Sequence, residues 1–413
     1  MAYLDRQRAS RLMAEAGLDG MILLSGESFA YATGAAPGVA TMWRRAGAVA
    51  VFVPADATLS ETAIVSDLFA GNFAAASHIT DIRESPIWVE TTDLAGDESG
   101  QAAEEIIKNA WQQAGRPPGF ARPTTFDPMI CFQHLADAIS EQGLKGAKIG
   151  FEASAVSVSD FPALQKALGH VDLIDASQIL ARLKMIKSVP EIANLRKAVE
   201  IAESGLRAIQ DAIAPAVTRS QLAQRWSQAI YSHPDHAGLS GDWEYISVGR
   251  NPWGGNAAAQ PGDVIKADVG CLVKGYTSDS ARTFLLGPAN DLQARIYAAL
   301  MQGFLAGSAL LAPGVALAEV HRVTQKAIRA AGFPDYTRGH FGHGLGAGPG
   351  SEEWPFIAAD ATAVFEPGMV MAFECPWYIT GLGGFIIENQ VLITQTGHEM
   401  MNSLPLDLIE IAP

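Results

Sequence analysis

The pattern of hydrophobic and polar positions divides the chain into two parts. In the first 175 residues, segments of helical spacing (5–16 and 102–114) alternate with short apolar runs. Apolar runs of this length between turn residues are typical of buried strands, and they occur at 20–24, 46–54, 62–66, 148–152 and 170–174. Helices that alternate with apolar strands predict a layered α/β domain.

A helix start marks the boundary between the two parts. Ser188 can cap a helix and Glu191 follows three residues later, as a capping box requires. Apolar residues then recur at helical spacing from Ile192 to Ile209. We therefore predict one domain over 1–180 and a second over 181–413.

The second part has a different pattern. Turns rich in glycine and proline separate predicted strands at 263–270, 276–286, 369–374 and 384–394. Predicted helices at about 219–231, 290–311 and 317–331 lie between them. This order predicts an α+β domain with a curved, mostly antiparallel sheet.

Composition and charge exclude several classes of protein. The 413 residues carry a net charge of −15, which disfavours binding to nucleic acid or to an anionic membrane surface. No apolar run approaches the roughly 20 residues that span a bilayer, and the N-terminus lacks a signal-peptide core. Three cysteines cannot form a disulfide framework. We predict a cytoplasmic protein.

Four acidic residues lie inside the apolar strands of the second part: Asp268, Asp279, Glu374 and Glu388. A buried carboxylate without a partner costs several kcal/mol, so it takes up a proton or binds a cation. Any one of these acids alone could be structural. Four of them exceed the nearby basic residues, chiefly Lys266 and Arg282, and so favour one or two divalent cations.

The spacing supports a shared site. Asp268 and Asp279 are 11 residues apart, and Glu374 and Glu388 are 14 apart, each pair separated by glycines. Because side chains alternate along a strand, two strands joined by a turn can place both carboxylates on one face. His343, between two glycines, can add a nitrogen ligand. Oxygen-rich ligation with one imidazole suits a pair of Mn, Fe, Co or Zn ions.

These motifs resemble one known family. The segments Asp268-x-Gly270, Ser278-Asp279-x-x-Arg282-Thr283, Gly342-His343-Gly344-x-Gly346, Glu374 and Ile387-Glu388 resemble, in order and spacing, the M24 "pita-bread" metallopeptidases. This family includes prolidase, aminopeptidase P and creatinase. Early segments, such as Gly17-Leu18-Asp19-Gly20, resemble the N-terminal domain of the prolidase and creatinase branch, which implies a ribonuclease-H-like α/β fold.

The resemblance implies a role for each ligand. Asp268 and Asp279 would hold one metal ion, His343 and Glu374 the second, and Asp279 and Glu388 would bridge the two. A hydroxide between the ions would be the nucleophile, and Glu374 could move its proton. The implied activity is hydrolysis of a C–N bond in a dipeptide-like or other small substrate that bears a carboxylate. Xaa-Pro dipeptidase or aminopeptidase activity is the first hypothesis, and a homodimer is expected.

The chain departs from the peptidase pattern at three places. A second histidine is expected seven residues after His343, where this chain has Gly350. An upstream histidine is absent from 251–256, and Ile386 stands where prolidase-like chains often have arginine. His340 could replace a missing histidine as a catalytic group, and Trp253 or Asn256 could line the substrate pocket.

These departures leave other functions open. A non-peptide amide substrate, as in ectoine-hydrolase-like or creatinase-like enzymes, is one alternative. A dimethylsulfoniopropionate lyase-like enzyme is another, although that branch has an extra Asp where this chain has Lys266. A non-catalytic binding module is the third. Arg44, in a segment that resembles creatinase, is a candidate for binding the substrate carboxylate, although it could equally be a solvated surface residue.

Overall fold

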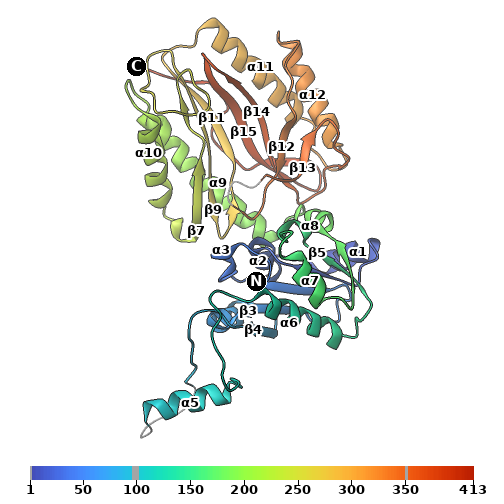
Figure 1. The fold of residues 1–413 in the computed structure, drawn as a ribbon. Helices are drawn as coiled ribbons and strands as arrows, with labels where there is room; N and C mark the ends of the chain where they lie inside the picture. The colour runs from blue at the N-terminus through green and yellow to red at the C-terminus, as the bar shows by residue number, and fades with distance from the viewer. Residues whose placement is uncertain (1, 95–101, 349–351) are drawn as a thin grey trace. The chain divides into compact units, whose positions relative to one another are not determined.

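The computed structural model describes residues 2–94, 102–348 and 352–413. The chain forms two compact units, Met1–Leu183 and Lys184–Pro413. No helix in the described ranges is long and apolar enough to cross a membrane. Each unit is built around its own sheet (Figure 1).

The N-terminal unit contains a six-stranded mixed sheet in the order β4-β3-β2-β1-β5-β6. Both faces of the central strands are buried. In β1, Met21 and Leu23 pack in one core, while Ile22 on the opposite face packs in the other. Burial on both faces explains why these strands have continuous apolar sequences instead of alternating ones. The helices and strands of this unit are α1 (Arg6–Glu15), β1 (Gly20–Leu23), α2 (Gly26–Thr33), α3 (Ala40–Trp43), β2 (Ala50–Pro54), β3 (Thr62–Ser66), α4 (Ala70–Ala76), β4 (Asp81–Ser85), α5 (Ala103–Gln113), α6 (Pro128–Glu141), β5 (Lys148–Phe151), α7 (Phe161–Ala167), β6 (Asp172–Asp175) and α8 (Ser177–Lys184).

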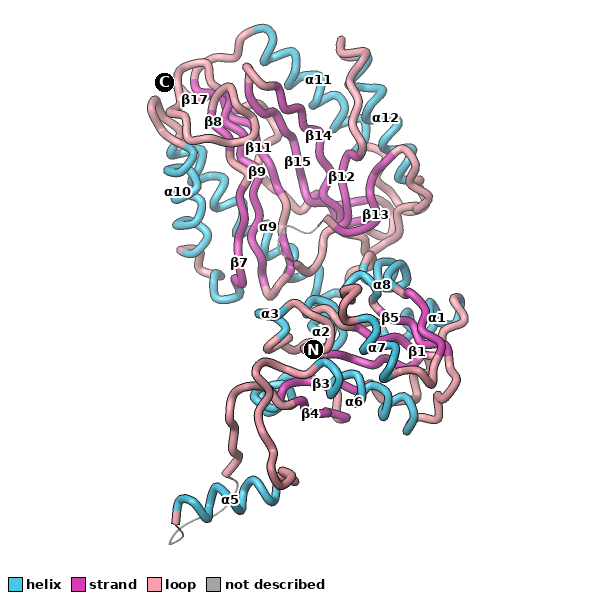
Figure 2. The backbone as a smooth tube through the Cα atoms, viewed as in Figure 1, coloured by secondary structure: helices cyan, strands magenta, loops and turns pink. Residues whose placement is uncertain are grey.

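The C-terminal unit contains an 11-stranded, curled sheet whose main path is β10-β9-β11-β15-β14-β12-β13 (Figure 2). Helices α9 and α10 pack with β9 and β11 in one core, and α11 and α12 pack with β14 and β15 in another. The elements are α9 (Val189–Ala212), α10 (Arg219–Tyr231), β7 (Leu239–Glu244), β8 (Ser247–Val248), β9 (Val264–Val273), β10 (Tyr276–Thr277), β11 (Ser280–Leu286), α11 (Asp291–Ser308), α12 (Leu317–Ala330), β12 (His340–Gly344), β13 (Glu353–Ala358), β14 (Val370–Ile379), β15 (Gly383–Ile393), β16 (His398–Met400) and β17 (Ile409–Ile411).

Alternation along the central strands separates core from site. On β9, Ile265, Ala267 and Val269 pack against the helices, so the residues between them point to the other face of the sheet. On β15, Phe385 and Ile387 do the same. The acidic residues of both strands occupy the alternate positions. One face of the sheet therefore carries the hydrophobic core, and the other carries the carboxylates.

The sequence-based elements agree with the structure where the pattern was strong. The predicted strand 62–66 is β3, and the predicted helix 219–231 is α10. The helix start at Ser188 is also confirmed, because the backbone N–H of Ser188 donates to the Glu191 carboxylate at 2.7 Å. Several elements were not predicted, among them helices α2, α4, α6, α7 and α8 and strands β4, β7, β12 and β13. The start of α6 falls in the segment 115–128 with its four prolines, which obscures the helical pattern. The β12 sequence contains two glycines in five residues and little apolar surface.

Candidate active site

Three of the four carboxylates lie in one row across the sheet. Ala281 on β11 pairs with Asp268 on β9 and with Glu388 on β15. Glu388 in turn pairs with Glu374 on β14. Residues directly opposite each other on neighbouring strands point to the same face. The row therefore presents three carboxylates on one surface, and the small side chain of Ala281 leaves the space between them open.

Asp279 and His343 complete the group. Asp279 lies two residues before Ala281, on the same face. One donor atom from each of Asp279, His343 and Glu388 lies within 4.8 Å of the others, and all three residues are buried. His343 Nε2 is 3.5 Å from Asp279 Oδ2. Its Nδ1 is 3.1 Å from the Gly344 carbonyl oxygen, which can only accept, so Nδ1 carries the proton and Nε2 is free to bind a metal ion.

Glycine at position 342 allows β12 to carry His343 close to β14. Gly342 has a φ of 144°, and a Cβ there would lie 2.0 Å from the carbonyl oxygen of Ala372. Any other residue would push the two strands apart. The flanking glycines of the Gly-His-Gly segment are thus needed for the backbone approach that brings the imidazole to the carboxylates.

Two basic residues reach the same group of acids. Arg338, just before β12, forms an ion pair with Glu374 in which Nη2 is 2.7 Å from Oε1. Lys266 Nζ on β9 is 3.4 Å from Asp268 Oδ2. Sequence reasoning missed Arg338 altogether. Its spacing of two residues before His340 was the available signal, because alternation along β12 places both on one side.

The four carboxylates, His343 and Arg338 line a polar cavity of about 270 Å³. Burial raises the pKa of Asp268 to about 6, and the charge of Glu374 adds to the effect of burial. Burial and then the charge of Asp268 raise the pKa of Asp279 well above its usual range. Burial, followed by the charge of Asp279, does the same to Glu388. The cavity thus holds more negative charge than its own basic residues neutralise, which favours a bound cation. The lining residues are Trp243, Tyr245, Asp268, Asp279, Arg338, His340, His343, Glu352, Glu374, Tyr378 and Glu388.

The other predicted site residues fall in different places. His340 lines the cavity, with Nδ1 3.7 Å from Glu374 Oε1, and burial lowers its pKa. Trp253 contacts the Tyr378 ring at 4.8 Å and is 73 % exposed. Asn256 accepts hydrogen bonds from Ser220 and does not line this cavity.

Two further positions from the sequence analysis are not among the described residues of the C-terminal unit. Arg44 is in the N-terminal unit, where its exposed side chain lies 3.8 Å from Glu27. Gly350, where the second family histidine is expected, is outside the described residues. Cys271 and Cys375, each within three residues of a proposed ligand, are buried free cysteines.

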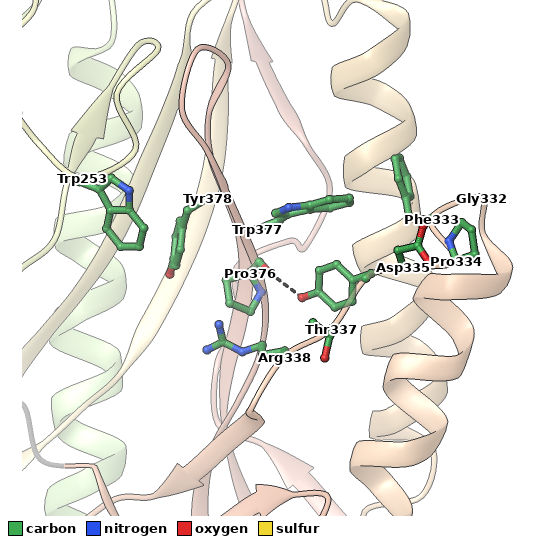
Figure 3. A pocket seen from close by; sticks show the side chains of 11 residues that line it. Trp253, Gly332, Phe333, Pro334, Asp335, Thr337, Arg338, Pro376, Trp377 and Tyr378 are labelled. Atoms are coloured by element: carbon green, nitrogen blue, oxygen red, sulfur yellow. Dashed lines mark hydrogen bonds between the residues drawn. The ribbon is translucent and has the colours of Figure 1, made fainter.

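Two further cavities adjoin the carboxylates. One, of about 550 Å³, is lined by the segment Gly332–Arg338 and by residues from Pro376 to Tyr378 (Figure 3). The Tyr336 hydroxyl donates to the Pro376 carbonyl at 2.7 Å, and this hydrogen bond links the two segments that line the cavity. The other, of about 610 Å³, shares Tyr245, Asp268 and Tyr378 with the carboxylate cavity. Tyr378 lines all three cavities.

Comparison with known families agrees with this geometry. The model of metallopeptidase family M24 matches residues 193–395, and that of the creatinase/prolidase N-terminal domain matches residues 6–186. The chain belongs to metallopeptidase family M24. It is a hydrolytic enzyme of that family, with a creatinase-type N-terminal domain and a pita-bread catalytic domain. Membership of this metallopeptidase family implies divalent metal cofactors.

Named relatives are peptidases. The uncharacterized peptidase YqhT of Bacillus subtilis is 30 % identical over 67 % of this chain and 78 % of the relative. The Xaa-Pro dipeptidase of Pyrococcus horikoshii is 27 % identical over 65 % of this chain and 77 % of that protein. Among solved structures, the Pyrococcus horikoshii prolidase superposes with a TM-score of 0.74, at 20 % identity over 98 % of this chain and 99 % of the other. These structures share the fold.

Proposed function

We propose that this enzyme is a dinuclear metal-dependent hydrolase that cleaves the amide bond of an Xaa-Pro dipeptide or a similar small substrate with a carboxylate. The observation that carries the proposal is the convergence of Asp268, Asp279, His343, Glu374 and Glu388 on one cavity. The names of the relatives support the substrate class.

The donor set fits two divalent cations. Asp279 Oδ1 is buried and has no hydrogen-bond partner among the described residues, so it is available as a ligand. In this proposal Asp268, Asp279, His343, Glu374 and Glu388 would hold the ions. Oxygen donors with one imidazole suit Mn, Fe, Co or Zn. Ions bound there supply Lewis acidity, which activates water near neutral pH and polarises the scissile carbonyl.

Glu374 and His340 are proposed to transfer the proton and to donate a hydrogen bond to the substrate carbonyl oxygen, respectively. Glu374 accepts a proton from the attacking water and passes it to the leaving nitrogen, while Arg338 holds one of its oxygens. His340 lies beside Glu374, and its lowered pKa, due to burial, keeps the imidazole neutral near pH 7. A neutral imidazole can donate a hydrogen bond to the substrate carbonyl, a role that one of the missing histidines would otherwise have.

Some earlier predictions are retained as part of the proposal. Trp253 lines the two adjoining cavities and contacts Tyr378, and it is proposed to contact substrate. Arg44 and Asn256 stay predictions, as do the homodimer and the cytoplasmic location. Because the second and the upstream histidine of the peptidase pattern are absent, a second candidate substrate stays open, a non-peptide amide such as a ring amide.

The test combines metal analysis with a substrate panel. Protein purified without chelators should contain about two equivalents of metal per chain by plasma mass spectrometry, and should hydrolyse Xaa-Pro dipeptides. Chelation should abolish activity, and adding metal back should restore it. Hydrolysis of ring amides but not dipeptides would favour the second candidate, and an alkene product would indicate a lyase. No metal uptake together with no hydrolysis would overturn the proposal.

A further inference from the structure

Lys266 is the feature of the site that the proposed hydrolysis leaves unexplained. It lies two residues before Asp268 on β9, so both side chains point to the same face. The Lys266 side chain is 7 % exposed. Its Nζ is 3.4 Å from Asp268 Oδ2 and 5.0 Å from the centre of the Tyr378 ring. Burying an ammonium is costly unless nearby acceptors compensate its charge, and the acid that pairs with Lys266 here is itself a proposed metal ligand.

The neighbouring strands leave room for this lysine. A Cβ at Gly384 on β15 would lie 3.2 Å from Lys266 Cδ and 3.4 Å from Ser247 Oγ. Ser247 pairs with Lys266 across β8 and β9. Its hydroxyl is buried and has no hydrogen-bond partner within the described ranges. Lys266 therefore lies in a buried slot beside Gly384, next to the Ser247 hydroxyl. This environment differs from that of a lysine on the surface.

The slot opens on the cavity of about 610 Å³. Aromatic side chains form much of its wall, namely Tyr245, Trp253 and Tyr378. Arg219 also lines this cavity, but it is committed to the Glu244 carboxylate and to the Ile246 carbonyl. Lys266 is thus the cation that can meet a ligand there. A molecule that occupies this cavity also reaches Asp268 and the other acids, because the two cavities share lining residues.

The balance of charges in the proposed site favours binding of an additional anion at Lys266. Two divalent ions would balance the four carboxylates, and Asp268 would then be engaged by metal. Lys266 and Arg338 would remain as positive charges without full compensation. Arg338 keeps a close contact to Glu374 at 2.7 Å and donates to the His340 carbonyl. Among the carboxylates of the described residues, Lys266 pairs with Asp268 alone, at the longer distance of 3.4 Å, so Lys266 is the better site for an additional anion.

We infer that Lys266 binds the carboxylate of the substrate, and that the adjoining Tyr245, Trp253 and Tyr378 contact the apolar ring next to that carboxylate. This inference rests on the proposed function, because it assigns the carboxylate end of the same substrate. It makes Lys266 a specificity-determining residue. The enzyme should prefer a free acid to the corresponding amide.

The experiment compares paired substrates on matched variants. Alanylproline and alanylprolinamide differ only at the carboxylate, and both offer the same scissile bond. In wild type, kcat/KM should be higher for the acid. Lys266→Met should lower kcat/KM for the acid by about 10- to 100-fold and for the amide by less than about 3-fold, whereas Lys266→Arg should keep part of the preference. Lys326→Met, on the exposed surface of α12, is the control.

Two outcomes would overturn the inference. Equal losses of kcat/KM for acid and amide in Lys266→Met would mean that Lys266 pairs with the Asp268 carboxylate and does not bind the carboxylate of the substrate. Loss of the acid preference in Arg338→Met but not in Lys266→Met would assign the carboxylate to Arg338. Metal content and the melting temperature of each variant show whether the variants are loaded and folded.

A binding measurement separates this inference from the proposed function. Titration calorimetry with proline and prolinamide needs no turnover. If wild type hydrolyses neither peptide but binds proline through Lys266, the proposed function fails and the inference stands. If wild type hydrolyses alanylproline but the Lys266→Met variant retains the acid preference and the affinity for proline, the inference fails and the proposed function stands.

Discussion

Two carboxylates, one in each unit, are about equally buried but differ in their hydrogen-bond partners. Glu152 in the N-terminal unit is 6 % exposed and accepts hydrogen bonds from the backbone N–H groups of Leu24 and Ser25 and from the Ser25 and Ser28 hydroxyls. Asp279 in the catalytic unit is about equally buried, at 9 %, yet its Oδ1 has no hydrogen-bond partner in the described part of the chain.

The difference is in the donors, not in the acids. Four donors fix Glu152 as a structural link between β1, α2 and the end of β5. Around Asp279 the nearest ionisable groups are other acids and His343, so the folded chain leaves its charge uncompensated. A buried carboxylate with a full set of donors stabilises the fold, whereas one surrounded by other carboxylates costs stability and requires a cation.

The largest effect should come from Asp279→Asn. Because one carboxylate of the proposed metal site is lost, kcat/KM should fall by about 1,000-fold or more, and the metal content should fall with it. The metal-free variant should melt no lower than metal-free wild type, since a costly buried charge is removed. Activity assays, plasma mass spectrometry and calorimetry measure the three quantities. Asp360→Asn, an exposed position in the same unit, is the control. Retained activity in Asp279→Asn would contradict the proposed role of Asp279 as a metal ligand.

Glu152→Ala should have the opposite profile. Removing the acceptor leaves four donors without their partner, so the free energy of unfolding should fall by about 2–4 kcal/mol. Activity per folded molecule should not change. Urea denaturation measures the first and active-site titration the second. Glu141→Ala, which breaks the exposed ion pair with Arg83, should cost under about 1 kcal/mol. Equal costs for both variants would contradict the structural role of Glu152.

The pH dependence of the metal-free enzyme sharpens the comparison further. Burial raises the pKa of Asp268 from its ordinary 3.8 to about 6, so the folded state binds this proton more tightly than the unfolded chain. Its contribution to stability is therefore lost as pH rises through 6 and regained as pH falls toward 4. Chelated wild type should gain about 3 °C in melting temperature, relative to chelated Asp268→Asn, between pH 7.5 and 5.5. An identical pH dependence in both proteins would refute this assignment.

The smallest change in stability should come from removing one hydrogen-bond donor to Glu191. This buried carboxylate is intermediate between Glu152, which has a full set of donors, and Asp279, whose Oδ1 has none among the described residues. It accepts from the backbone N–H and hydroxyl of Ser188 and from the Tyr276 hydroxyl, although burial still raises its pKa. Ser188→Ala removes one of these donors and should cost about 1 kcal/mol of unfolding free energy. Denaturant unfolding with an unchanged slope would show this loss, while a stability equal to that of wild type would show that the hydroxyl contributes nothing.

The sequence predicted the parts of this molecule that depend on local pattern. Strand alternation places Asp268 and Glu388 opposite a hydrophobic core, and a single sequence is enough to see it. The family resemblance supplied the set of proposed ligands. Arg338 and the neighbours of Lys266 could not be predicted in the same way. Their roles depend on which strands become adjacent and in what register, and β12 pairs with β14 only in the folded sheet.

The row formed by Asp268, Glu388 and Glu374 also determines when the site comes into existence. The proposed ligands are supplied by strands that lie up to 120 residues apart in the chain, from position 268 to position 388. Contacts between such distant segments form late in folding, because a long loop must close first. A fragment that ends before β15 lacks Glu388 and has no complete site. Metal uptake by this enzyme should therefore report the last step of its assembly, and a nascent chain should remain metal-free until β15 has joined the sheet.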